Sequence, residues 1–367
     1  MLITGVDCFH VALPVKLGGA GRANNAGWSI RNIASFDHFL LRIETQDQLT
    51  GWGEAFAFKG AEALTAVVNK LLKPSLLCAD TSDIAQISHR LQFENHLWGR
   101  YGLTMFGISA VDIALWDLAG KRAGQPLFNM LGGRCNALTA YASLPRYGNG
   151  EVATELACRA VKEGYRHIKL HETDPEVIAQ VRSAIGPDIG LMVDTNCAWN
   201  ETEAITAARD MEGLDLMMIE EPVFPPEDFA ALARVQKAGG IPIAAGECAC
   251  THFEFQHMLE AGAVSYIQPS VSKVGGISEF LKISELSRQF SVPVMPHSPY
   301  LGPGFLATMH LLSALHPESL LECIYPDGIN SRFYPGLIQR DGMLSPPQAP
   351  GLGLDPDESV IEKYRVD

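Results

Sequence analysis

The stretch "GLMVDTN" at residues 190–196 decides the fold, because it is one of eight short apolar runs that end in polar residues. The polar ends lie 23 to 27 residues apart, which is the length of chain that a strand, a helix and two loops need. The pattern therefore predicts βα units that close as a (β/α)8 TIM-type barrel. The runs are "LTAYASL", "RHIKLHE", "GLMVDTN", "LMMIEEP", "IPIAAGE", "VSYIQPS", "VPVMPHS" and "SLLECIY".

An open doubly wound sheet is the competing α/β architecture. It would normally place a glycine-rich phosphate loop directly after its first strand. The glycines of "LGGAGR" at 17–22 lack the required switch from strand to helix, so we interpret them as a mobile loop. The barrel is the more economical prediction.

The chain of 367 residues is long enough for a barrel and a smaller domain. Residues 1–125 show alternating segments first, such as "CFHVALPV", and helical periodicity afterwards, as in "GISAVDIALWDLAGKRAG". We therefore predict an N-terminal α+β capping domain at 1–125 and the barrel at 126–325. The segment 326–367 is rich in Pro and Gly, and we expect it to return to the capping domain and complete it.

Composition excludes several classes of protein. The chain is 47% hydrophobic and 19% charged without an apolar run of about 18 residues, so we expect no membrane span. A net charge of −14 argues against a nucleic-acid partner, and it means that a bound anion needs a local device such as a metal. The start "MLITGVDCFHVALPVKL" does not resemble a signal peptide, and the eight cysteines form no CxxC pair. We expect a cytoplasmic protein with reduced thiols.

Three carboxylates end successive predicted strands, where the active sites of such barrels lie. They are Asp194, Glu220 and Glu247. Hard oxygen ligands that converge from adjacent strands, with water or substrate in the remaining positions, suit Mg²⁺ better than Zn²⁺. We therefore predict a magnesium site formed by these three residues.

Candidate acid–base groups surround this predicted site. Lys169 and His171 are two residues apart in one strand and so face the same side, and His297 ends the seventh run. We expect a divalent cation and a second cationic group to lower the pKa of Lys169, while a histidine titrates near neutrality. Bases on opposite walls with a metal between them predict proton abstraction next to a carboxylate. Glu322, if protonated, would hydrogen-bond the developing enolate.

Several motifs together resemble the enolase superfamily, and specifically its mandelate racemase and muconate lactonizing enzyme branch. The resemblance covers nearly the whole chain and rests on "TGWGEA" (50–55), "GISAVDIALWDLAGKRAGQPLFNMLGG" (107–133), "IKLH", "MVDTN" (192–196), "IEEPV" (219–223), "AAGE" (244–247), "IQPSVSKVGGI" (267–277) and "MPHS" (295–298).

The resemblance carries implications for individual residues. It implies that Asp194, Glu220 and Glu247 are the metal ligands, and that two cap loops, at 16–32 and 54–60, close over the substrate. It matches Lys169 to the first lysine of the family's KxK strand, Asn196 to a polar residue beside substrate or metal, and Glu322 to the electrophilic carboxylic acid.

Two positions depart from the family pattern. His171 stands where the KxK strand has its second lysine, so imidazole or Lys169 handles the proton on that side. Ser270 stands where mandelate racemase-like enzymes have an aspartate beside the seventh-strand histidine, so we expect His297 to have a lower proton affinity. Gln268, on the same face, is an alternative partner for that ring.

We expect Mg²⁺-dependent abstraction of the proton α to a carboxylate, followed by loss of a β-hydroxyl, which is dehydration of a sugar acid to a 2-keto-3-deoxy acid. The alternatives are a racemase or epimerase, or a cycloisomerase, of a carboxylic acid by the same enolate chemistry, and a non-catalytic metal-binding barrel. The expected partner is a small-molecule carboxylate, a hydroxylated sugar acid whose identity the sequence leaves open. We also expect a homo-oligomer.

Overall fold

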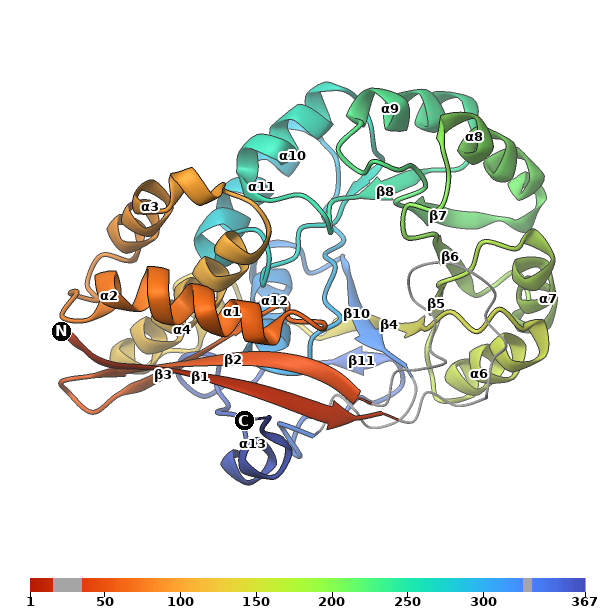
Figure 1. The fold of residues 1–367 in the computed structure, drawn as a ribbon. Coiled ribbons are helices and arrows are strands. Elements are labelled where there is room, and N and C mark those ends of the chain that lie inside the picture. Colours follow the sequence, from red (N-terminus) through yellow and green to blue (C-terminus); the bar gives the residue numbers. More distant parts are fainter. Residues whose placement is uncertain (16–34, 326–331, 367) are drawn as a thin grey trace.

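A computed structural model describes residues 1–15, 35–325 and 332–366 of the chain (Figure 1). These residues form an antiparallel three-stranded sheet with its helices on one side of the molecule, and a parallel sheet ringed by helices on the other (Figure 1). The predicted class, a (β/α)8 barrel with an α+β capping domain, is confirmed. The predicted domain boundaries stay a prediction.

The capping sheet has the strand order β1-β2-β3 with antiparallel pairing throughout. Helices cover one face of this sheet (Figure 1). The elements are β1 (Ile3–Pro14), β2 (Ser35–Thr45), β3 (Thr50–Ala55), α1 (Ala61–Val67), the π-helical turn η2 (Val68–Leu72), α2 (Lys73–Leu76), α3 (Ile84–Glu94), the 3-10 turn η3 (His96–Trp98) and α4 (Gly102–Ala123).

The glycines of "TGWGEA" allow α4 to lie directly on β3. A Cβ atom at Gly53 would meet the carbonyl oxygen of Ala110 at 1.9 Å, and one at Gly51 would meet that of Ala114 at 2.3 Å. Only glycine permits so close an approach of backbone to sheet. α4 is long and apolar enough to cross a membrane, but 72% of its apolar window is buried in the structure. It packs between β3 and α11 as a core helix does.

The barrel sheet has the order β10-β4-β5-β6-β7-β8-β9, and its strand pairs along this path are parallel. The seventh predicted run supplies only a bridge between Val294 and Ile267. The strands are β4 (Leu138–Leu144), β5 (His167–Leu170), β6 (Gly190–Asp194), β7 (Leu216–Glu220), β8 (Ile243–Ala245), β9 (Tyr266–Ile267) and β10 (Leu320–Ile324).

Helices α6 to α10 form an arc around the outside of the barrel strands (Figure 1). Side-chain caps fix the starts of three of them: Asn149 caps α6, Asp174 caps α7 just before Pro175, and Asn200 forms a capping box with Glu203 in α8. The elements are α5 (Leu127–Met130), α6 (Gly150–Lys162), α7 (Pro175–Ile185), α8 (Glu201–Asp210), η4 (Glu212–Leu214), α9 (Phe229–Ala238), α10 (Thr251–Glu260), α11 (Gly276–Phe290) and α12 (Pro303–Leu315).

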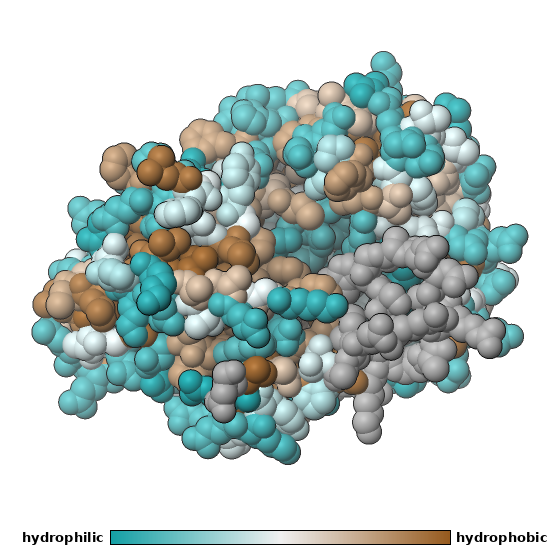
Figure 2. All heavy atoms as spheres, in the orientation of Figure 1, coloured by the Kyte–Doolittle hydropathy of each residue, from teal (hydrophilic) through white to brown (hydrophobic). Residues whose placement is uncertain are grey.

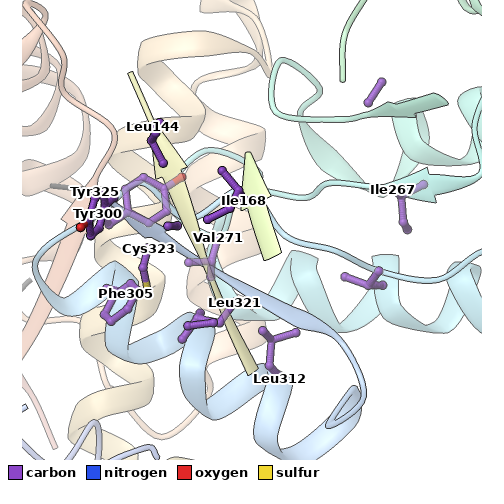
Figure 3. Close-up of a cluster of buried hydrophobic side chains, with 14 of the residues drawn as sticks. Leu144, Ile168, Ile267, Val271, Tyr300, Phe305, Leu312, Leu321, Cys323 and Tyr325 are labelled. Atoms are coloured by element: carbon purple, nitrogen blue, oxygen red, sulfur yellow. The ribbon is translucent and has the colours of Figure 1, made fainter. Parts of the chain in front are cut away.

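Alternation along the strands decides which side chains point into the barrel. Leu191 and Val193 of β6 belong to the large core cluster that strands and helices share. Figure 3 shows part of this cluster, with Leu144 and Ile168 on neighbouring strands and Leu321 near Leu312 of α12. Met192 belongs instead to a small cluster with Tyr141, Met218, Ala244 and Met295, which are the inward-facing residues of the strands. Asp194 lies two residues after Met192, and Glu220 lies two residues after Met218. Because alternate residues of a strand point to the same side, both carboxylates point into the barrel.

The C-terminal segment contacts both parts of the molecule. β11 (Met343–Leu344) pairs antiparallel with β4 of the barrel, and Arg365, directly after α13 (Glu358–Tyr364), forms a bridge with Val11 of β1. α13 lies beneath the capping sheet in Figure 1. The segment therefore joins the barrel to the capping domain.

Candidate active site

A pocket lies where the capping domain meets the C-terminal ends of the barrel strands. On the face shown in Figure 2 the surface is hollowed between the two parts. From the capping domain the pocket is lined by Phe36, Asp37, His38 and residues 54–58, which are part of the predicted loop 54–60. The other predicted cap loop, 16–32, with its glycines at 17–22, lies outside the described residues. The barrel contributes Ser143, Pro145, Arg146, His171, Asn196, Glu247, His297, Pro299, Tyr300, Glu322 and Ile324.

The three predicted metal ligands are close together. One carboxylate oxygen each of Asp194, Glu220 and Glu247 lies within 4.8 Å of the others. Asp194 and Glu220 are buried, and Oε1 of Glu220 has no hydrogen-bond partner. Burial together with the nearby Asp194 carboxylate raises the pKa of Glu220. An unpaired buried oxygen amid converging carboxylates fits a hard divalent cation such as Mg²⁺.

Lys169 is buried beneath these carboxylates. Its Nζ lies 2.8 Å from Oε1 of Glu322, 2.9 Å from Oε2 of Glu220 and 3.7 Å from Oδ2 of Asp194. Burial alone would lower the pKa of Lys169, but Glu220 and Glu322 raise it well above its ordinary value. The predicted lowering of this pKa depends on a bound divalent cation and stays a prediction, while among the protein's own groups three carboxylates surround the ammonium group.

His171 lines the pocket at the end of β5. Its Nδ1–H donates to the carbonyl oxygen of Leu144 at 2.7 Å, which leaves Nε2 as the nitrogen that faces Asp194 Oδ2 at 3.1 Å. Burial would lower the pKa of His171, but the Asp194 carboxylate raises it. His171 thus presents one fixed nitrogen beside the acid cluster, whereas Lys169 is not among the residues that line the pocket.

His297 lies in the same pocket and contacts the third carboxylate. Its Nε2 is 2.7 Å from Oε2 of Glu247, and Nδ1 is 3.0 Å from the hydroxyl oxygen of Ser270. The alternative partner, Gln268, makes no side-chain hydrogen bond. Ser270 therefore orients the ring in place of the family's aspartate, as a neutral partner.

Glu322 is held as a carboxylate. Oε1 accepts hydrogen bonds from Ser143 and Lys169 at 2.8 Å each, and Oε2 accepts one from the backbone N–H of Ser298 at 2.8 Å. Burial would raise the pKa of Glu322, but the Lys169 ammonium group lowers it. These three partners are all donors, and the role of a protonated Glu322 as donor to the developing enolate stays a prediction.

A buried arginine that the sequence pattern did not indicate lies beside Asn196. Arg146 donates to the backbone carbonyls of His171 and Thr195 at 3.1 and 3.0 Å, and to Oδ1 of Asn196 at 3.3 Å. The backbone N–H of Asn196 donates to Asp194 Oδ1 at 2.8 Å. Arg146 therefore ties the loops after β5 and β6 together. Its position two residues beyond the first strand was the only signal in the sequence.

Lys273 was also missed. It is buried, with Nζ 4.8 Å from the ring centre of Phe56 and 5.6 Å from that of Phe106. Burial would lower the pKa of Lys273, but Glu247 raises it. The lysine adds a positive charge behind Glu247. It is part of the quoted motif "IQPSVSKVGGI" (267–277), but the sequence pattern gave it no role of its own.

The fold and the site define a class: a barrel whose strand ends gather a carboxylate cluster that fits a divalent cation, with a lysine and two histidines around it. Two family profiles match this chain. The first is the mandelate racemase / muconate lactonizing enzyme N-terminal domain, at residues 28–132, and the second is the enolase C-terminal domain-like family, at 152–360. The chain belongs to the mandelate racemase / muconate lactonizing enzyme family of the enolase superfamily.

Characterised relatives share about a third of their residues with this chain. An arabinonate dehydratase of Saccharolobus solfataricus is 31% identical, over 88% of this chain and 89% of its own. A D-galactarolactone cycloisomerase of Agrobacterium fabrum is 33% identical, over 90% and 91%. The crystal structure of a racemase from Streptomyces coelicolor with bound magnesium superposes with a TM-score of 0.89 at 29% identity and covers all of both chains.

The protein is accordingly an enolase-superfamily enzyme, a lyase or an isomerase, that acts on a small-molecule carboxylate. The alternative of a non-catalytic barrel is not supported, because these relatives are named for reactions.

Proposed function

We propose that the protein removes the proton α to the carboxylate of a hydroxylated sugar acid and dehydrates the acid to a 2-keto-3-deoxy acid. The observation that carries this proposal is that two histidines, His171 and His297, line one pocket together with Glu247, a member of the carboxylate cluster. Their Nε2 atoms contact different carboxylates of the cluster, Asp194 at 3.1 Å and Glu247 at 2.7 Å. The dehydratase names of relatives support the reaction type.

Asp194, Glu220 and Glu247 would hold Mg²⁺ in this proposal. The ion, when bound, supplies positive charge that offsets the charge developing on the substrate carboxylate as the α-proton leaves. The relative with bound magnesium supports this choice of ion.

The two histidines would share the proton transfers. Nε2 of His171 is its exchangeable nitrogen because Leu144 occupies Nδ1, and Nε2 of His297 is likewise its pocket-side nitrogen because Ser270 occupies Nδ1. One ring removes the α-proton and the other protonates the departing β-hydroxide. This assigns the proton on the β5 side to His171. Lys169, enclosed by carboxylates, positions them and balances their charge.

Asn196 and Glu322 would complete the site. Asn196 lines the pocket and is oriented by Arg146, which suits an amide that hydrogen-bonds substrate. Glu322, which lines the pocket as well, holds Lys169 and the N–H of Ser298 in place.

The test is incubation of the purified protein with Mg²⁺ and a panel of aldonic and aldaric acids, with an assay for 2-keto-3-deoxy acids. We expect product from at least one acid, together with deuterium incorporation at C3 of the product in D2O. No product from any acid, with metal occupancy confirmed, would rule out the dehydratase.

A cycloisomerase is the second candidate, because relatives of that name match over nearly the whole chain. Racemisation or epimerisation uses the same two opposed bases. Both predict exchange of the α-proton with solvent without a keto product, and a cycloisomerase also predicts a change in the lactone or anhydro ring, which NMR detects.

We further propose a cytoplasmic homo-oligomer. The described surface exposes large apolar side chains around η3, namely Phe93, Leu97, Trp98 and Tyr101, which supports self-association. All eight cysteines are free thiols, which supports a reducing compartment. Sedimentation equilibrium of wild type and Trp98→Glu tests the assembly, and a monomeric wild type would contradict it.

A further inference from the structure

One imidazole nitrogen in the pocket lacks a partner. His38 comes from β2 of the capping sheet, is 5% exposed and lines the same pocket as His297 and Glu322. Its Nε2 is buried and makes no hydrogen bond with any residue that the structure describes. Buried polar atoms are almost always paired, so an unpaired one that borders a binding pocket indicates a place for a ligand atom.

The opposite side of the ring is fixed. Nδ1 of His38 lies 3.1 Å from Oε1 of Glu54, whose side chain is 1% exposed. The other oxygen of Glu54 accepts hydrogen bonds from the backbone N–H groups of Gly302 and Gly304, at 3.1 and 2.9 Å. These N–H groups belong to the start of α12, where a carboxylate is favoured. Glu54 is therefore a rigid, fully bonded anchor for Nδ1.

A third element holds the plane of the ring. The ring of Phe333, from the C-terminal segment, packs edge to face against His38, with ring centres 5.4 Å apart and planes at 85°. The imidazole is thus located by the capping sheet, by α12 of the barrel through Glu54, and by the C-terminal segment. Only Nε2 is left without a bond in this arrangement.

We propose that Nε2 of His38 hydrogen-bonds a hydroxyl group of the bound acid at the end away from its carboxylate. The proposal rests on the proposed function, which places the substrate carboxylate at the acid cluster of the barrel, whereas His38 belongs to the opposite, capping wall. A hydroxyl fits because it both donates and accepts. It donates to Nε2 when Nδ1–H is bonded to Glu54, and it accepts from Nε2–H when the ring is protonated.

The surroundings make this bond selective. Phe36, Phe56 and Tyr300 line the pocket, and Asp37, the other polar residue that β2 contributes to the pocket lining, is bonded to His10 at 3.1 Å. In a site with apolar walls an acid without the hydroxyl would leave Nε2 unpaired, and such sites discriminate strongly against the analogue that lacks the group. His38 is therefore a specificity-determining residue.

Two substitutions separate ligand binding from structural support. The side-chain nitrogen of asparagine takes the place of Nδ1, so His38→Asn keeps the bond to Glu54 and loses the pocket-facing nitrogen. The nitrogen of glutamine takes the place of Nε2, so His38→Gln keeps the pocket-facing group. Binding of D-galactonate, D-gluconate, D-mannonate and D-glycerate, in the presence of Mg²⁺, is measured by calorimetry on the wild-type chain and both variants. D-glycerate lacks every hydroxyl beyond the β-carbon.

The readout is the affinity ratio of the best six-carbon acid to D-glycerate. We expect wild type and His38→Gln to prefer the six-carbon acid, and His38→Asn to lose about fivefold or more of this preference. The proposal is overturned if wild type has no preference, if Asn preserves it, or if both variants lose it equally. The proposed function is judged separately by keto product, so a His38-dependent preference without dehydration would refute only the dehydratase.

Discussion

Nζ of Lys169 and Oε1 of Glu322 lie 2.8 Å apart in the barrel interior, and neither side chain is more than 1% exposed. Removing one partner of such a pair leaves uncompensated buried charge. We expect Lys169→Met to lower the free energy of unfolding by about 3 to 5 kcal/mol in urea titrations. Its matched control, Lys162→Met on the exposed side of α6, should stay within about 0.5 kcal/mol of wild type. Equal stability of the two variants would contradict the role of Lys169 as a charge-balancing residue.

Addition of Mg²⁺ should stabilise the protein against thermal unfolding. At a concentration 100 times its dissociation constant an ion that binds only the folded state adds about 2.7 kcal/mol. Glu220→Gln should weaken Mg²⁺ binding by more than about tenfold, because it replaces a charged oxygen of the cluster. Titrations of the melting temperature measure this, with Glu155→Gln on exposed helix surface as the control. If Glu220→Gln binds Mg²⁺ as tightly as the control, the ligand assignment is wrong.

His171→Asn should lower kcat by about 100- to 10,000-fold, because the amide keeps the bond to Leu144 but has no exchangeable nitrogen in place of Nε2. His167→Asn is the matched control, since His167 lies four residues earlier, at the start of β5, and lines a different pocket. Exchange of the substrate α-proton in D2O tells which histidine is the base. Of His171→Asn and His297→Asn, the variant that lacks the base should lose this exchange, and the variant that lacks the acid should retain it. Full exchange in both His171→Asn and His297→Asn would mean that neither histidine is the base and that Lys169 removes the α-proton.

The regularity of the barrel made much of this site predictable. The constant spacing of the strand ends and the alternation of inward residues are enough to predict that Asp194 and Glu220 lie on one face of the sheet, and their pairing in the structure agrees. The partners of each group were not predictable in this way. The environment of Lys169 depends on Glu322, and the bond of His38 depends on Glu54 and α12, which lie far apart in the chain. Such contacts follow from how domains pack, which no local pattern encodes.

The partner of His297 could not be predicted from the sequence either, although both candidates are close to each other in the chain. Both Ser270 and Gln268 share a face in the sequence pattern, but only Ser270 Oγ comes within 3.0 Å of Nδ1. β9 is two residues long, so the alternation that orders longer strands ends before these positions. The choice between them therefore depended on loop geometry.

Acid should destabilise the protein partly through His310, which is buried in α12. Its Nδ1 accepts a hydrogen bond from the N–H of Phe128 and its Nε2–H donates to the carbonyl of Leu352, so the folded protein requires the neutral ring. Burial lowers the pKa of His310 to about 4. Between about pH 6.5 and 4 the unfolded chain binds a proton at this position and the folded chain does not. The free energy of unfolding therefore decreases as the pH is lowered, by up to about 1.4 kcal/mol per pH unit. Urea unfolding measures the free energy of unfolding at each pH. For His310→Met, the slope of this free energy against pH should be shallower by the equivalent of about one proton, although the variant is less stable than wild type at pH 7.5. Parallel profiles of wild type and variant would show that His310 does not contribute to the acid sensitivity.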